Sequence, residues 1–381
     1  MKKVDTLIRN GHVVDPSQNV DRQMDIGIQN GVIVPVEPGD EGLRNIDASG
    51  LYVTPGLIDF HTHVFHTGSA TSVNPVFMAA TGVTSTVDAG TAGYANFRAF
   101  FDSVIIPSPV RVKSYLNVWG GGQTDTNIQE KFEPSEYRPQ QIARIVDAYR
   151  DNILGLKIRY SKGIASSIDS LKETIRIARN SNIRVCIHTT NPPTPLDEVA
   201  GLLEKDDIYC HMYQGMGDET ILDTSSGKIR GSILKARERG VIFDSANGRA
   251  NFSFAVAIPA MKQGFHPDII STDWTIDKLN YSPHAKNLPY VMAKFLKFGM
   301  SFNEVIRAVT QSPARLMGME GKIGTLRAEA YGDIAVFKKI QHKVIQQDFS
   351  GATFETDELL IPQMTVIGGD IVFCQGDFAF A

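Results

Sequence analysis

The sequence of 381 residues predicts an α/β fold, namely a (β/α)8 TIM barrel with a small β domain formed by the N- and C-terminal segments. Eight apolar, β-branched runs alternate with amphipathic stretches, a pattern and a span that suit such a barrel. No glycine-rich phosphate-binding fingerprint follows the first run, which disfavours the alternative of an open doubly wound sheet. The flanking segments instead show short strand-like runs separated by turn residues.

The barrel strands are predicted from the apolar runs, and its helices from the stretches between them. Over residues 142–149, apolar side chains recur at i, i+3, i+4 and i+7, and residues 168–178 also keep one apolar face. Both spacings predict helices that cover the sheet. The strands are expected at residues 57–60, 83–87, 111–118, 154–160, 184–188, 208–212, 241–244 and 269–272.

The two ends of the chain are predicted to form one small β-sandwich-like domain of residues 1–54 and 320–381, beside a barrel of residues 55–319. Short strands are expected at 6–8, 12–14 and 25–28, with tight turns at the Asn-Gly pairs 10–11 and 30–31 because both residue types tolerate positive φ. After a helical segment at 302–317, β character returns at 324–326, 333–337, 365–367 and 370–373.

Composition limits the class of protein. Lys plus Arg number 38 and Asp plus Glu 42, so the net charge of −4 gives no reason to expect nucleic acid or an anionic membrane as partner. Three cysteines cannot form a disulfide framework and favour a cytoplasmic location. The apolar run 252–261 is too short for a membrane span and is expected to be a buried helix. A small-molecule substrate is the expected partner, and a homo-oligomer stays open.

Chemistry-bearing residues stand at the carboxyl ends of five predicted strands, where barrel enzymes place their active sites. In the pair His61 and His63, side chains at i and i+2 share one face of a strand and can hold one metal ion. Imidazole suits zinc and related divalent ions. A single histidine at a strand end is usually structural, but the whole set indicates a metal site: His61, His63, Lys157, His188, His211 and Asp273.

These residues carry a family resemblance. The run Pro-Gly-Leu-Ile-Asp-Phe-His-Thr-His at 55–63 resembles the strand-one signature of the amidohydrolase superfamily, and residues 324–337 resemble its returning β segment. The match is closest to the binuclear, dihydroorotase-like branch. Within that branch, Lys157-Ile158-Arg159 and Ser271-Thr272-Asp273 are similar to an amidohydrolase/deacetylase subgroup.

The resemblance implies two divalent metal ions, with zinc expected, bridged by a carboxylated Lys157 and a hydroxide. A lysine ammonium beside two dications would be repelled, whereas its carbamate is a bridging anion. The resemblance further implies that Lys157 serves both metals. His61, His63 and Asp273 would complete the more buried site, and His188 and His211 the more exposed one. Asp273 would also be the catalytic residue that moves the proton.

Several residues bear on the substrate. Dihydroorotases carry His-x-His-x-Arg after strand one, but Phe65 stands at the arginine position here, which disfavours dihydroorotase activity. Arg159 is the replacement candidate, because strand alternation aims it into the same mouth as Lys157, where it either binds a substrate carboxylate or forms a surface salt bridge. Further candidates that either contact substrate or are structural are Ser161, Tyr213 and Asn247. Cys186 is expected to face the barrel interior and Cys210 the helix layer.

The leading functional prediction is a zinc-dependent hydrolase of an exocyclic acyl amide or ester on a small carboxylate-bearing substrate. The main alternative is a cyclic amide hydrolase of the dihydroorotase or hydantoinase type. A mononuclear deaminase is a third candidate, but it would not need the bridging Lys157. A non-catalytic scaffold usually loses ligands, whereas all six candidate ligands are present here.

Overall fold

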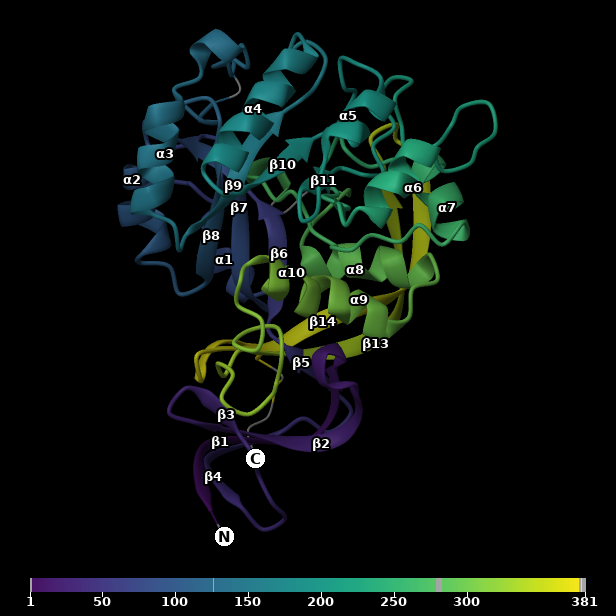
Figure 1. The fold of residues 1–381 in the computed structure, drawn as a ribbon. Coiled ribbons are helices and arrows are strands. Elements are labelled where there is room, and N and C mark those ends of the chain that lie inside the picture. The colour runs from purple at the N-terminus through teal and green to yellow at the C-terminus, as the bar shows by residue number, and fades with distance from the viewer. Residues whose placement is uncertain (1, 126, 279–282, 377, 379–381) are drawn as a thin grey trace.

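The computed structural model describes residues 2–125, 127–278, 283–376 and 378. Its larger unit is the predicted TIM barrel (Figure 1). In the described residues, seven parallel strands follow one another in chain order around the sheet, as the βα alternation predicts. They are β6 (Leu57–Thr62), β7 (Val83–Gly93), β8 (Arg111–Asn117), β9 (Ile153–Arg159), β10 (Arg184–His188), β11 (Ile208–Cys210) and β12 (Ile242–Asp244).

The eighth predicted strand, 269–272, closes the ring without forming a regular strand. Isolated parallel bridges join Asp244 to Ile269 on one side and Thr62 to Trp274 on the other. The backbone N–H of Asp273 donates to His61 O at 2.8 Å, although Asp273 has a left-handed φ of 53°. This φ interrupts the extended backbone, so the closing segment 269–274 has strand-like bonding but no continuous ladder.

Helices cover the outside of the barrel (Figure 1). The predicted apolar face of 168–178 lies in α4, where Leu171 and Ala178 are fully buried. The segment 302–317 is two helices, since the chain turns at Thr310, and the buried run 252–261 is largely helix with Pro259 inside it. The helices are α1 (Val76–Ala79), α2 (Phe97–Phe100), α3 (Pro139–Ala148), α4 (Ile168–Asn180), α5 (Leu196–Leu202), α6 (Gly231–Glu238), α7 (Phe254–Lys262), α8 (Leu288–Lys297), α9 (Phe302–Val309) and α10 (Gln311–Leu316). Shorter helical turns lie at Pro16–Gln18, Phe101–Ile105, Pro134–Glu136 and Ile276–Lys278.

The terminal segments meet in a second, mixed sheet of order β15-β14-β13-β5-β1-β2-β3, with β4 also paired to β1. The Asn-Gly pair at 30–31 forms the predicted turn, with φ of 50° and 76°. The pair at 10–11 does not: it is a bulge within β1, where the register to β2 shifts between Ile8 and Gly11. Residues 324–326 are not a strand. The strands are β1 (Lys3–Asp15), β2 (Val20–Gln29), β3 (Val32–Val34), β4 (Glu41–Asp47), β5 (Tyr52–Pro55), β13 (Ile334–Gln347), β14 (Thr353–Ile367) and β15 (Asp370–Cys374).

The long hairpin of β13 and β14 ties this sheet to the barrel helices. Its Phe354 ring lies 5.2 Å from Phe254 of α7 and 4.8 Å from Phe298, which caps α8. Gln346 of β13 donates to the backbone oxygen of Tyr290 in α8 at 3.0 Å. The division of the chain after residues 54 and 319 stays a prediction. No helix within the described residues has the length and apolar character needed to cross a membrane.

Candidate metal centre

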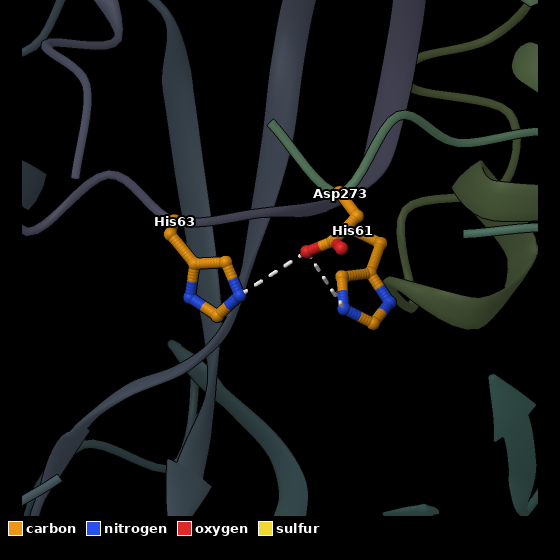
Figure 2. A group of neighbouring side chains, drawn as sticks. All are labelled: His61, His63 and Asp273. Atoms are coloured by element: carbon orange, nitrogen blue, oxygen red, sulfur yellow. Dashed lines mark ion pairs between the residues drawn. The ribbon is translucent and has the colours of Figure 1, made fainter. Parts of the chain in front are cut away.

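Three predicted ligands meet at the carboxyl end of β6 and the closing segment (Figure 2). Asp273 Oδ1 lies 3.4 Å from His63 Nε2 and 3.8 Å from His61 Nε2. One ligand atom from each of the three residues lies within 4.8 Å of the others, and all three side chains are buried. Two imidazoles and a carboxylate at this spacing fit a divalent ion of the zinc type.

The remaining predicted ligands gather beside this group. Lys157 Nζ on β9 lies 3.4 Å from His61 Nε2. The rings of His188, at the end of β10, and His211, directly after β11, have centroids 4.2 Å apart, and His211 lies 5.0 Å from the His61 ring. The structure therefore brings all six residues to one place, while their roles as ligands stay a proposal.

Neighbouring groups hold the outer ring nitrogens of three histidines. His61 Nδ1 lies 3.3 Å from Asp244 Oδ2, and His211 Nδ1 lies 2.7 Å from the backbone oxygen of Ala246. His63 Nδ1 lies 2.8 Å from Thr91 Oγ1. Such contacts fix the tautomer and the ring direction of a metal-binding histidine and leave Nε2 for the ion. The contact of Asp244 with His61 was not predicted, although Asp244 is an acidic residue at the end of the seventh predicted strand.

Burial sets the charge state of this centre. It holds the pKa of both His61 and His188 well below the ordinary value, with nearby cationic groups adding to the effect. Neutral imidazole is the form that binds metal. Burial also raises the pKa of Asp244 to about 7, although Ser271 and Ala246 donate hydrogen bonds to its carboxylate. The imidazoles of His61 and His188 are thus neutral, which is the form that a metal ion requires.

The thiols of two cysteines lie close to the Lys157 amine. Cys186 Sγ and Cys210 Sγ are 3.2 Å apart, at 3.6 Å and 3.8 Å from Lys157 Nζ. The prediction that Cys210 faces the helix layer is wrong: it packs with Cys186 in the barrel interior. The reason is that β11 ends at Cys210 and His211 has a left-handed φ of 59°, so the strand alternation assumed in the prediction stops one residue early.

A cavity of about 490 Å³ opens onto the centre. Arg159 and Ser161 line it together with five of the six candidate ligands, namely His61, His63, Lys157, His188 and Asp273. Arg159 Nη1 donates to Glu130 Oε2 at 2.5 Å, and Glu130 is 1% exposed while Arg159 is 28% exposed. Ser161 Oγ is buried and makes no hydrogen bond within the described part of the chain. The Glu130 partner was not predicted, because its loop carries no periodic signal.

Tyr213 and Asn247 do not line the cavity, which favours the structural role that the sequence left open for both residues. The Tyr213 hydroxyl donates to the backbone oxygen of Phe265 at 2.8 Å in the helix layer, again because the chain turns at His211. Asn247 is fully buried, and its amide binds His284 O and Lys294 Nζ. Phe65, at the position of the dihydroorotase arginine, is buried and packs on Phe100 at 4.8 Å.

Comparison with known proteins agrees with this site. The model of the Amidohydrolase family matches residues 52–372, so the chain belongs to that family. A deacetylase of Agrobacterium fabrum is 31% identical over 86% of this chain and 81% of its own. A deacetylase of Enterococcus faecalis is 29% identical over 96% of this chain and 98% of its own.

Solved structures give the same picture. A crystal structure of an adenine deaminase superposes with a TM-score of 0.88 at 27% identity, over 98% of this chain and 100% of its own. A crystal structure of a dihydroorotase superposes with a TM-score of 0.86 at 29% identity, over 97% of this chain and 98% of its own. Family membership and the buried histidine–aspartate cluster together identify a metal-dependent hydrolase.

Proposed function

We propose that this protein is a zinc-dependent deacylase that removes an exocyclic acyl group, held as an amide or ester, from a small carboxylate-bearing substrate. The observation that carries the proposal is the position of Arg159, a partly exposed cation that lines the same cavity as Asp273 and Lys157. Deacetylases among the relatives support the reaction type. A small molecule is the partner, and the cytoplasm the expected location.

The six gathered residues supply the ligands. His61, His63 and Asp273 would hold one zinc ion, His188 and His211 the second, and a carboxylated Lys157 would serve both. When bound, two such ions supply Lewis acidity, which makes a hydroxide nucleophile available near neutral pH and polarises an acyl carbonyl. Carboxylation also removes a buried positive charge from beside the cations.

Asp273 is the group of this chain that moves the proton. Its Oδ1 faces both His61 and His63, at the inner end of the cavity where the scissile bond must lie. A carboxylate there accepts the proton of the attacking water and returns it to the leaving nitrogen or oxygen. Among the described residues that line the cavity, the other acidic one is Asp277, which pairs with the exposed Arg249 at 3.5 Å.

Arg159 binds the substrate carboxylate in this proposal. Glu130 engages its Nη1, while Nη2 and Nε make no hydrogen bond within the described residues. The buried Glu130 thereby fixes the guanidinium plane, and the other N–H groups remain for a bidentate contact. Ser161, two residues further along, offers a buried hydroxyl to the same substrate group.

A substrate screen on the zinc-loaded protein tests this function. N-acyl amino acids and acylated hydroxy acids should be hydrolysed, and their methyl esters and decarboxylated analogues should react more slowly. Cyclic ureides and dihydroorotate form the second panel, because dihydroorotases are among the relatives. Adenine is added as a third test compound, because the structure of an adenine deaminase is similar. Turnover of the cyclic panel alone would replace the proposal with ring opening, and release of ammonia from adenine alone would replace it with deamination.

A further inference from the structure

The carboxylate of Asp273 has a second support that is independent of the two histidines. While Oδ1 faces His61 and His63, Oδ2 accepts a hydrogen bond from Asn251 Nδ2 at 2.9 Å. Asn251 comes from the loop after β12, is 8% exposed and lines the cavity. With both oxygens oriented, rotation of the carboxylate about its Cβ–Cγ bond is restricted.

The Asn251 amide is itself held in one orientation. Its Oδ1 accepts from the hydroxyl of Thr190, which lies just beyond β10, at 2.8 Å. A flipped amide would place its oxygen against the Asp273 carboxylate and lose that hydrogen bond. Asn251 therefore joins the closing segment of the barrel to the loop that follows His188.

The loop backbone is shaped for close approach to Asp273. Gly248 has a φ of +54°, and a Cβ there would lie 2.5 Å from Asp273 Oδ2 and 2.6 Å from Asn251 Nδ2. Only glycine fits this position without moving the carboxylate or the amide. The backbone N–H groups of Asn247 and Gly248 donate to Ser271 O and Thr272 O, each at 3.0 Å, so the loop is bonded to the segment that carries Asp273.

A buried lysine fastens the other side of the loop. Lys294 of α8 is 0% exposed, and its Nζ donates to Asn247 Oδ1 at 2.5 Å while lying 4.1 Å from the centre of the Phe252 ring. Asn247 Nδ2 donates to His284 O at 2.9 Å. Burial of an amine is costly unless it is hydrogen-bonded, and in the described residues Asn247 provides that bond.

We propose that Asn251 is a positioning residue for Asp273, and that the Lys294–Asn247 contact holds the loop from which Asn251 reaches it. The inference rests on the proposed function, in which Asp273 moves the proton. It assigns roles to Asn251 and Lys294 that neither metal binding nor substrate binding requires. Asn247, for which the sequence left open a substrate contact or a structural role, connects this loop to Lys294 in the proposal.

The test compares Asn251→Ala with the isosteric Asn251→Asp at pH 8. Loss of a hydrogen bond to a charged group should lower kcat about 10- to 100-fold with little change in KM. Asn251→Asp keeps the shape and the acceptor for Thr190 but loses the donor, so its kcat should fall at least as far. Wild-type kcat in Asn251→Asp, or a rise in KM alone for either variant, would overturn the positioning role.

A spectroscopic measurement makes the test independent of turnover. With cobalt(II) in place of zinc, the visible absorption bands should differ between wild type and Asn251→Ala at equal metal content and equal melting temperature. Unchanged bands, or loss of metal, would also overturn the role. If wild type hydrolyses none of the screened substrates, the proposed function fails, and the cobalt spectra still decide the Asn251–Asp273 contact.

Lys294→Met tests the contact between Lys294 and Asn247. It should lower kcat about 3- to 10-fold, and the double variant with Asn251→Ala should lose less than the product of the two single losses, since both act through one loop. Lys297→Met, on the same helix but paired at the surface with Asp357, is the matched control and should keep wild-type turnover. Independent, multiplicative losses would show that Lys294 does not act through Asn251.

Discussion

The two halves of the candidate metal centre differ in how complete they are. On one side, His61, His63 and Asp273 place three ligand atoms within 4.8 Å of one another. On the other, His188 and His211 stand with ring centroids 4.2 Å apart, and the amine of Lys157 lies at the border of the two halves, 3.4 Å from His61 Nε2. The first half has the ligand atoms of a candidate metal site without any modification. The second becomes one, under the proposed function, only when Lys157 is carboxylated.

The largest expected effect comes from removing the group that joins the halves. Lys157→Ala should lower the metal content from about two ions per chain to about one and abolish turnover, because the second half then has two imidazoles and no anion. Short carboxylic acids that occupy the space left by the Lys157 side chain should restore part of the metal content and part of the turnover. Metal analysis with and without added formate or acetate checks this. Two ions per chain and normal turnover without rescue would show that the halves do not depend on Lys157.

The next largest effect concerns the half formed by His61, His63 and Asp273. Asp273→Asn keeps the size of the side chain and an oxygen that can face the ion, but removes the proton acceptor. We expect kcat to fall about 10²- to 10⁴-fold with the fold intact. Steady-state kinetics beside circular dichroism and metal analysis check this. A loss below tenfold with the metals retained would mean that another group moves the proton.

A smaller effect concerns the substrate side of the second half. Arg159→Met should lower kcat/KM about 10- to 150-fold for a substrate with a free carboxylate, since a charge-assisted contact is worth about 1.5–3 kcal/mol. The methyl ester of the same substrate should lose little. Equal losses on the acid and the ester would show that Arg159, through its contact with Glu130, supports the site structurally.

The last effect is on stability and not on turnover, and it concerns the contacts of Lys294 behind the first half. Burial lowers the pKa of Lys294 to about 7, partly offset by the carboxylate of Asp348. Between about pH 7 and 10 the unfolded chain holds a proton that the folded chain lacks, so the free energy of unfolding should rise with pH relative to Lys294→Met. The slope is at most about 1.4 kcal/mol per pH unit and vanishes below about pH 7.

Urea denaturation of wild type, Lys294→Met and Lys297→Met at several pH values measures this slope. His284, whose pKa burial lowers, also lies within the electrostatic reach of Lys294, but it titrates below this window. A difference between wild type and Lys294→Met that does not vary with pH would show that Lys294 stays charged in the folded protein.

The barrel and the six gathered residues were predictable because they rest on rules that act locally. Apolar runs with strand periodicity gave β6 to β12, and the ends of those strands gave the candidate ligands. A candidate ligand at a strand end is predicted from its residue type and its position in the strand alone. His61 and Lys157 could therefore be predicted without knowing which residues surround them in the folded protein.

What failed depended on backbone conformation that the sequence does not display. The left-handed φ of His211 turned Tyr213 away from the cavity and Cys210 into the barrel. The same conformation at Asp273 broke the eighth strand, and at Asn10 it produced a bulge in place of a turn. Asn251 and Glu130 stand in aperiodic loops, and their contacts with Asp273 and Arg159 arise only from folding.

The second sheet has a consequence for the order in which the protein is made. Strand β5 pairs on one side with β1, which is already synthesised, but its other edge pairs with residues 334–337 of β13. On the ribosome that edge must wait until the whole barrel has been translated, and an open strand edge is a site of wrong pairing. The barrel is therefore expected to begin folding while the sheet that holds its first strand in place is still half built. Emergence of β13 from the ribosome is then the step that lets β5 complete its pairing.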